Sequence, residues 1–196
     1  MKKVNVYVDG LNLYCGALKG REGCKWLDIR LVCKRLLNAD DLDVKSIKYF
    51  TALVHSKEAK KRQEKYIDAL ETDKNTTVIK GEHKNGKEKK TDVNIAINML
   101  HDAVQNEYET AVLISNDSDF VPVIKMVKNE YQKEVLVIRP ILNNLHRGRK
   151  RGGGCYELEE AASGVRDLKR EGIIRVSQYP DLIIHEGHEI KKPDGW

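Results

Sequence analysis

The sequence predicts an α/β fold whose central sheet has five strands, most of them parallel. Short apolar segments typical of buried strands alternate along the chain with segments whose apolar residues recur at helical spacing. Such alternating units are joined by right-handed crossovers, which place helices on both faces of a parallel sheet. The composition agrees, because 196 residues with 40% apolar and 33% charged side chains suit a globular chain with one core.

The first half of the chain contributes three strands and two helices to this prediction. The opening strand is apolar and ends at Asp9-Gly10, where a turn begins. The second helix carries many lysines, so we expect it to be exposed. The predicted elements are, in order, a strand at 4–8, a helix at 28–37, a strand at 44–53, a helix at 58–70 and a strand at 76–80.

The second half opens with a polar loop at 81–90, with Gly86 as its expected turn, and continues with the most regular helix. Ile95, Met99 and Ala103 repeat there at helical spacing after Asp92, and Thr91 is the expected N-cap. Pro122 is compatible with the first turn of a later helix. The elements that follow are a strand at 110–115, a helix at 121–129 and a strand at 134–138.

After Pro140 the regular pattern ends. Residues 143–154 are basic and then glycine-rich, residues 156–168 predict one or two helices over the sheet edge, and residues 177–196 predict an extended wrap. We therefore expect residues 1–142 to form the main domain. Residues 143–196 would add a basic loop, covering helices and a C-terminal wrap to the same domain.

The sequence also indicates where the protein resides. Its longest apolar runs are far shorter than the roughly 20 residues that span a bilayer, and no apolar signal region follows the first lysines, so we expect a cytoplasmic protein without a membrane partner. The four cysteines lack the paired short spacing of zinc sites, and we interpret them as reduced thiols.

Positive charge is concentrated in a few segments. The net charge of +5 favours a polyanionic partner through steering and counterion release. The basic segments are 57–65, 84–90 and 146–151. The best-placed acids, in contrast, stand singly at the ends of apolar segments, which is the pattern a metal-dependent nuclease needs.

Four aspartates are the candidate catalytic and metal-binding residues. In an open parallel sheet, ligands bind beyond the carboxyl ends of the strands where the strand order reverses, which directs attention to the first and fourth strands. Carboxylates gathered there would repel one another unless a divalent cation joined them, and Mg²⁺ or Mn²⁺ suits an all-oxygen site. The four are Asp9, Asp92, Asp117 and Asp119.

Each of these acids also has an ordinary structural explanation. Asp119 or Ser118 would cap the helix that begins near Phe120, and Asp92 would be a first-turn acid favoured by the helix dipole. Asp9-Gly10 would be a plain turn. The conjunction of all four at the predicted strand ends is what favours a metal site.

Three segments also resemble a known family. They are Val8-Asp9-Gly10-Leu11-Asn12-Leu13, Lys90-Thr91-Asp92-Val93-Asn94-Ile95-Ala96, and the stretch from Leu113 to Pro122 that contains Ser115-Asn116-Asp117-Ser118-Asp119-Phe120. In order and spacing they resemble the NYN family of PIN-like nucleases, in its LabA-like branch, over roughly residues 1–140. The resemblance implies a Rossmann-like, three-layer PIN-type fold, with residues 1–142 as the nuclease domain. It also implies metal-dependent, endonucleolytic cleavage of RNA.

The resemblance assigns roles to individual residues. It makes the four aspartates the acidic set and Asn12 and Ser115 the polar neighbours that orient metal or substrate, with Asn116 and Ser118 beside them. In many family members the third helix looks like Asp-x-x-x-x-x-Asp. Here the first aspartate corresponds to Asp92, and the second position is Asn98. Because one carboxylate of the family pattern is missing, the resemblance supports a first metal ion better than a second. It also leaves open a catalytically weakened RNA-binding or regulatory module of the same fold.

Several basic and aromatic residues are candidates for holding the substrate. Lys90 would contact phosphate beside Asp92, and the basic run would follow the backbone of single-stranded or looped RNA, its ordinary alternative being a solvated loop. Tyr14 and Trp26 are candidates for base stacking, with core packing the better explanation for Trp26. A homodimer is compatible with this picture, and a small-molecule phosphohydrolase is a third alternative. The residues of the basic run are Arg147, Arg149, Lys150 and Arg151.

Overall fold

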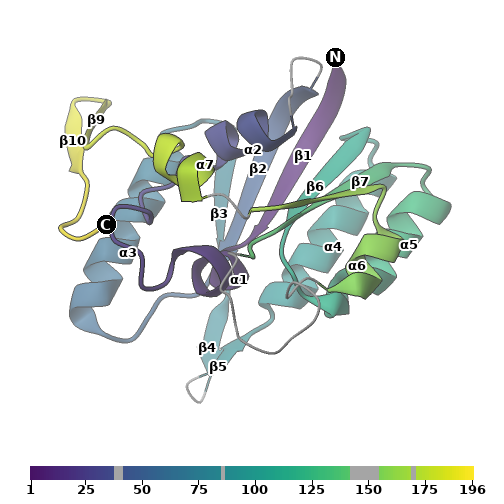
Figure 1. The fold of residues 1–196 in the computed structure, drawn as a ribbon, viewed down its shortest axis with the longest axis horizontal. Coiled ribbons are helices and arrows are strands. Elements are labelled where there is room, and N and C mark those ends of the chain that lie inside the picture. Colours follow the sequence, from purple (N-terminus) through teal and green to yellow (C-terminus); the bar gives the residue numbers. More distant parts are fainter. Residues whose placement is uncertain (38–41, 85–86, 142–154, 169–170) are drawn as a thin grey trace.

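The computed structural model describes residues 1–37, 42–84, 87–141, 155–168 and 171–196. At its centre lies a six-stranded sheet in the order β3-β2-β1-β6-β7-β8 (Figure 1). Every neighbouring pair in this sheet is parallel. The strands are β1 (Lys2–Asp9), β2 (Leu42–Thr51), β3 (Thr76–Lys80), β6 (Thr110–Ile114), β7 (Glu134–Arg139) and β8 (Gly164–Asp167).

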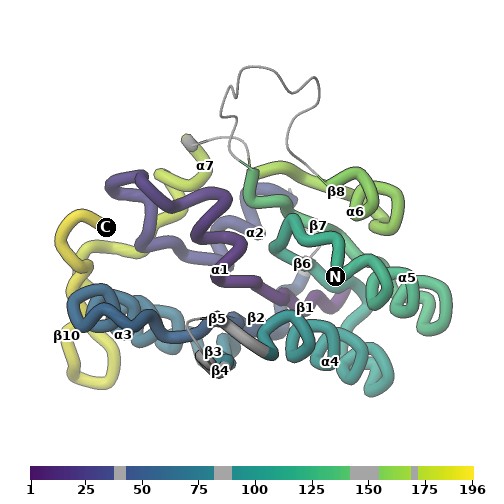
Figure 2. The backbone as a smooth tube through the Cα atoms, turned by 90° about the horizontal axis from the view of Figure 1, so that it is seen from below, coloured from purple at the N-terminus to yellow at the C-terminus, as the bar shows by residue number. Residues whose placement is uncertain are grey.

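Helices cover both faces of the sheet, as the alternation of elements predicts. Alternate residues of β1 point to opposite faces, so Val6 joins one apolar cluster and Tyr7 the other. The first cluster includes side chains of α2 and α3, and the second includes side chains of α4, α5 and α6; Figure 2 shows α2 and α4 on opposite sides of β1. The helical segments are α1 (Gly10–Leu13), the π-helical η1 (Tyr14–Leu18), α2 (Ile29–Leu37), α3 (Lys57–Glu71), α4 (Thr91–Val104), the 3₁₀ turn η2 (Ser118–Phe120), α5 (Val121–Asn129), α6 (Tyr156–Ala161) and α7 (Glu171–Val176).

The α/β prediction is confirmed, but the number of strands was wrong. The sixth strand, β8, lies in the stretch 156–168 that was expected to be helical, and only α6 is a helix there. β8 pairs with the edge of β7, and the Arg139 Nε atom lies 2.6 Å from a carboxylate oxygen of Asp167. Tertiary pairing and this ion pair define β8, because its four residues carry no periodic pattern of their own.

The segment before α4 also differs from the prediction. Within the expected loop at 81–90, β4 (Glu82–Lys84) and β5 (Lys87–Lys89) pair as an antiparallel hairpin. The expected turn at Gly86 lies outside the described residues. Thr91 is the first residue of α4 and not its cap, since Lys90 occupies the N-cap position in the left-handed conformation with φ of 73°. That backbone is unfavourable for a residue with a Cβ, so the entry to α4 is conformationally strained.

The C-terminal residues return to the core, as the predicted wrap requires, but they contain a hairpin. It consists of β9 (Leu182–His185) and β10 (His188–Lys191). Trp26 is fully buried, as expected from core packing, and its indole N–H donates to the carbonyl of Pro180 at 2.9 Å. The Trp196 ring lies 5.8 Å from that of Tyr66 on α3. None of the helices in the described ranges is long and apolar enough to cross a membrane.

The predicted free thiols are confirmed, and one of them makes stability sensitive to alkaline pH. Burial raises the pKa of the Cys33 thiol from 9.0 to about 12. The folded state therefore favours the neutral thiol, and the stability this provides is complete below pH 9 and is lost as the pH rises from 9 towards 12. Between pH 9 and pH 12 we expect the free energy of unfolding to fall more steeply in the wild type than in Cys33→Val, which has no thiol to ionise. The difference in slope should be about 1.4 kcal/mol per pH unit. Urea denaturation with reductant at pH 8, 9, 10 and 11 measures the difference. Parallel curves for the two proteins would contradict it, since the buried tyrosines are common to both.

Candidate active site

The strand order places a reversal point between β1 and β6. From β1 the chain adds β2 and β3 on one side, and the later strands β6, β7 and β8 on the other. The carboxyl ends of β1 and β6 therefore border the crevice where open α/β sheets bind ligands. Asp9 is the last residue of β1, and Ser115 follows β6 directly. The structure thus brings together the two strand ends that the sequence selects.

Asp9 is a buried carboxylate that also starts the first helix. Only 4% of its surface is exposed. Its Oδ1 accepts a hydrogen bond from the backbone N–H of Asn12 at 2.9 Å, which caps α1. Its Oδ2 accepts one from the Ser115 hydroxyl at 3.1 Å. These donors fix the orientation of the carboxylate.

Gly10 allows α1 to turn immediately after Asp9. A Cβ at this position would lie 2.7 Å from the carbonyl oxygen of Phe50 and 2.8 Å from the Tyr49 ring. Both atoms belong to β2, so a larger residue would push α1 away from the sheet. The Asp-Gly pair is therefore more than a plain turn, because it places a helix directly against the strand end.

Ser115 links Asp9 to Asp117. Its Oγ donates to Asp9 and accepts a hydrogen bond from the backbone N–H of Asp117 at 3.2 Å. Asp117 in turn caps η2, since its Oδ1 accepts from the N–H of Asp119 at 3.0 Å. The cap of this turn is thus Asp117, where the sequence suggested Asp119 or Ser118. One hydroxyl therefore sets the relative position of the two carboxylate-bearing segments.

Two asparagines brace the same region. The backbone N–H of Asn116 donates to Oδ1 of Asn12 at 3.1 Å, and Oδ1 of Asn116 accepts from the N–H of Cys155 at 2.9 Å. These contacts join α1, the loop after β6 and the residue before α6. Asn116 thus braces α1 and the residue before α6, and its contact with substrate stays a prediction.

The carboxylates open into a cavity of about 320 Å³ at this crevice. Asp9, Asp117 and Asp92 come from three separate segments, and Lys90 lies beside Asp92. Asn12 was also predicted, whereas sequence reasoning missed Leu11 and Cys15, which lie on the continuous helical segment of α1 and η1, and Thr91. The lining consists of Asp9, Leu11, Asn12, Cys15, Lys90, Thr91, Asp92 and Asp117.

Two of the predicted acids lie differently from what their sequence context suggests. Asp92 is exposed at the start of α4, so the argument that its charge faces the core was wrong. Asp119 is also exposed and is absent from the cavity lining, while Ser118 is half-buried within η2. The structure therefore gathers three of the four candidate carboxylates.

The oxygen-rich lining fits a hard divalent cation by donor type, but its arrangement is open. Within the described ranges, no group of three or more His, Cys, Asp or Glu side chains is assembled closely enough to hold a metal ion. Both oxygens of Asp9 already accept protein hydrogen bonds, so only their remaining lone pairs are available to a cation. The carboxylates border one space without forming a closed ligand cage.

Asn98 lies apart from this cavity. Its Oδ1 accepts from the Lys48 ammonium at 3.0 Å, and its Nδ2 donates to the carbonyl of Asn94 at 2.9 Å. The departure from the family pattern at this position therefore removes no carboxylate from the cavity lining. The basic candidates Arg147, Arg149, Lys150 and Arg151 lie outside the described residues.

Comparisons with known proteins agree with this architecture. Residues 3–146 match the family model described as NYN domain. The chain is 25% identical over 242 residues to 6-hydroxy-3-succinoylpyridine 3-monooxygenase HspA of Pseudomonas putida, covering 99% of this chain and 75% of that protein. It also resembles the crystal structure of VPA0982, a protein of unknown function from Vibrio parahaemolyticus. That likeness has a TM-score of 0.59 and 20% identity and covers 86% of this chain and 93% of that one, and at this identity it supports the fold alone.

Proposed function

The chain belongs to the NYN domain family, and on this premise we propose that it is a metal-dependent endoribonuclease that cleaves single-stranded RNA. The observation that carries the proposal is the convergence of Asp9, Asp92 and Asp117 on one cavity at the reversal point of the sheet. NYN proteins are in general PIN-like nucleases, and an acidic cavity of this kind serves phosphodiester hydrolysis.

In this proposal Asp9, Asp117 and Asp92 hold Mg²⁺ or Mn²⁺. When bound, such an ion lowers the pKa of a water ligand and neutralises charge on the phosphate oxygens. Asp9 is held in place by Ser115 and the Asn12 N–H, so little reorganisation is needed when substrate arrives.

Lys90 supplies positive charge at the cavity. It lines the same space as Asp92, and its left-handed backbone fixes the point from which its side chain extends. We assign it to a nonbridging oxygen of the substrate phosphate. The predicted contacts of Arg147, Arg149, Lys150 and Arg151 with the RNA backbone remain part of the proposal, as does a cytoplasmic location.

Asp117→Asn tests the catalytic proposal. We expect wild-type protein with Mn²⁺ or Mg²⁺ to cleave an unstructured oligoribonucleotide, and the variant to lose on the order of 10²–10³-fold in rate because a carboxylate charge disappears. The asparagine Oδ1 can still accept from the Asp119 N–H, so the melting temperature should change little. Gel-resolved cleavage and thermal melting measure both. The control is Asp181→Asn, an exposed acid paired with Lys192. Wild-type protein that leaves diverse RNA and DNA intact over a range of metals would refute the proposal.

The alternative of a weakened, RNA-binding module retains the fold and the basic surface but not turnover. This alternative was inferred from Asn98, which stands where many family members carry an aspartate. In the structure, however, an acid at position 98 would face Lys48 and would not complete the cavity. Salt-sensitive RNA binding without cleavage would favour this alternative.

A second candidate function comes from the curated relative. That protein is named as a 3-monooxygenase of 6-hydroxy-3-succinoylpyridine, and this chain also contains an aromatic-lined cavity of about 190 Å³. Incubating the protein with that pyridine, molecular oxygen and an electron donor, followed by mass spectrometry, tests whether a hydroxylated product forms. Product formation without RNA cleavage would replace the nuclease proposal.

A further inference from the structure

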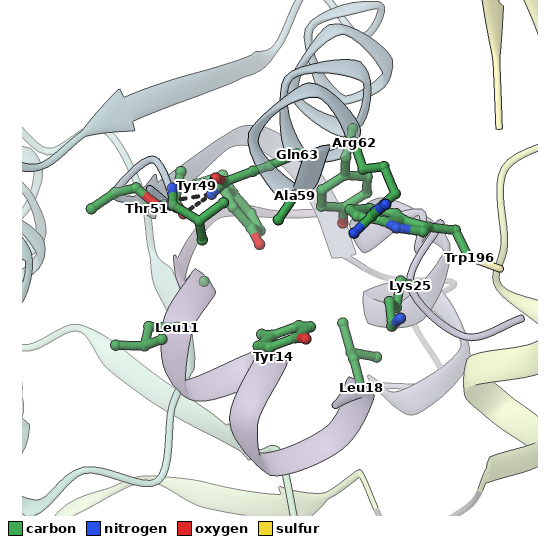
Figure 3. A pocket seen from close by; sticks show the side chains of 14 residues that line it. Leu11, Tyr14, Leu18, Lys25, Tyr49, Thr51, Ala59, Arg62, Gln63 and Trp196 are labelled. Carbon is green, nitrogen blue, oxygen red and sulfur yellow. Dashed lines mark hydrogen bonds between the residues drawn. The ribbon is translucent and has the colours of Figure 1, made fainter. Parts of the chain in front are cut away.

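A second cavity lies between the α1–η1 segment and α3 (Figure 3). Tyr49 and Tyr66 are buried and contribute to its walls, and Tyr14 is 39% exposed. In Figure 3 the Tyr14 ring lies across the gap from Ala59 and Arg62, with Trp196 and Lys25 towards one side. The space therefore has the form of a slot bordered by rings.

The slot has apolar walls and positive charge. The Lys25 ammonium lies 6.0 Å from the centre of the Trp196 ring. Arg62 is exposed and lines the same slot. The described residues that line the slot include no aspartate or glutamate. A planar ring attached to an anionic group matches this combination, since rings stack on aromatic side chains and cations attract the anion.

Hydrogen bonds hold the side chains opposite Tyr14 in place. The Gln63 amide donates to the Thr51 hydroxyl and the Ala52 carbonyl, both at 3.0 Å, and its oxygen accepts from the Val54 N–H at 2.9 Å. The Tyr66 hydroxyl donates to the Leu27 carbonyl at 2.8 Å. Because these side chains are already fixed, binding a ring there requires little ordering.

The slot adjoins the acidic cavity through the first helical segment. Leu11 lines both spaces, and Gly10 of the slot follows Asp9 of the acidic cavity in the chain. Leu11, Tyr14 and Leu18 follow helical spacing on the slot side, whereas Asn12 and Cys15 face the acidic cavity. A ligand with its phosphate among the aspartates therefore has a ring-binding site immediately beside it.

We propose that the slot binds the base of one unpaired nucleotide next to the phosphate held at the acidic cavity. This inference rests on the proposed function and adds the reason for single-strand selectivity. The slot has room for one ring system, so a base must leave its duplex partner before it enters. Tyr14 and Trp196 stack on the base, and Arg62 and Lys25 attract the adjoining phosphates.

Equilibrium binding of a fluorescently labelled single-stranded oligoribonucleotide to the full chain tests the slot. Ca²⁺ replaces Mg²⁺ or Mn²⁺ so that the acidic cavity keeps a cation for the phosphate, and a gel confirms that the RNA stays intact. We expect Tyr14→Ala to weaken binding about ten-fold or more and Tyr14→Phe to bind like wild type, because stacking needs the ring and not the hydroxyl. Tyr156→Ala, at a residue that is 62% exposed on α6, serves as the control. A duplex of the same sequence should bind wild type and Tyr14→Ala equally.

Intrinsic fluorescence gives an independent readout of the same site. Trp196 lines the slot and Trp26 is buried in the core, so single-stranded RNA should quench the wild type and not Trp196→Phe. Equal binding by wild type, Tyr14→Ala and Tyr14→Phe would overturn the inference even if RNA is cleaved. Tyr14-dependent binding without cleavage would support the slot and reject the nuclease proposal. If a pyridine carboxylic acid bound in a Tyr14-dependent manner and RNA did not, the slot would be a small-molecule site and the inference would be wrong.

Discussion

Asp9→Asn is expected to reduce the cleavage of single-stranded RNA by on the order of 10³-fold under the proposed function. Asp9 is the most buried of the three cavity carboxylates, and it contributes its charge where two strand ends meet. A charge in such a shielded position acts more strongly than one in water. Single-turnover cleavage rates with saturating enzyme measure the effect without interference from substrate binding.

The substitution should leave the fold intact. The asparagine retains an Oδ1 that accepts from the Asn12 N–H, and the Ser115 hydroxyl can rotate to accept from the new amide. The melting temperature should therefore stay close to that of the wild type, and Asp194→Asn, at an exposed acid near the C-terminus, supplies the control. If folded Asp9→Asn cleaved RNA at the wild-type rate, the acidic cavity would not be the site of reaction.

The sequence predicts those parts of the fold whose residues carry their own periodicity. β1, β6 and β7 are apolar runs, and α4 repeats Ile95, Met99 and Ala103, so both layers and the parallel sheet follow from local patterns. β8 carries no such pattern, and its pairing with β7 becomes visible only in three dimensions. The β4–β5 hairpin was missed for the same reason, because the sequences of Glu82–Lys84 and Lys87–Lys89 contain no apolar residue and so show no alternation of apolar and polar positions.

The candidate site shows the same division. Asp9 and Asp117 could be placed because each follows an apolar strand, and parallel strands end at one edge of the sheet. The exposure of Asp92 could not be predicted, because the apolar stripe of a helix does not show that a residue of its first turn is exposed to solvent. The aromatic slot was beyond prediction as well. Tyr14 and Trp196 stand at opposite ends of the chain, and only the packing of the tail against α3 brings them to one space.

The largest stability effect is expected from Asp102→Ala, on the same helix as Asp92 but near its other end. Asp102 is buried and accepts hydrogen bonds from the Tyr7 hydroxyl at 2.7 Å and the Lys48 ammonium at 2.9 Å. Burial and the Asp102 carboxylate both raise the pKa of Tyr7 well above its ordinary value, so the hydroxyl remains a donor. Removing the acid leaves the buried Tyr7 hydroxyl without this acceptor and leaves the partly buried Lys48 ammonium with Asn98 but without its ion-pair partner. We expect a loss of about 2–3 kcal/mol of unfolding free energy, since an unsatisfied buried donor costs about 1–3 kcal/mol and the Lys48 ammonium retains some solvent contact.

Urea denaturation of Asp102→Ala against wild type measures this cost, and two further variants make it specific. Glu189→Ala removes an acid from the exposed pair with Lys191 and should change stability little. The double variant Lys48→Met with Asp102→Leu should recover part of the loss, because an apolar pair leaves no unpaired charge in the interior. A midpoint for Asp102→Ala within error of the wild type would mean that Lys48 finds another partner or water, and that the cluster does not stabilise the fold. Since Asp102 lies ten residues from Asp92, about 15 Å along a helix, the double variant should still cleave RNA where it remains folded.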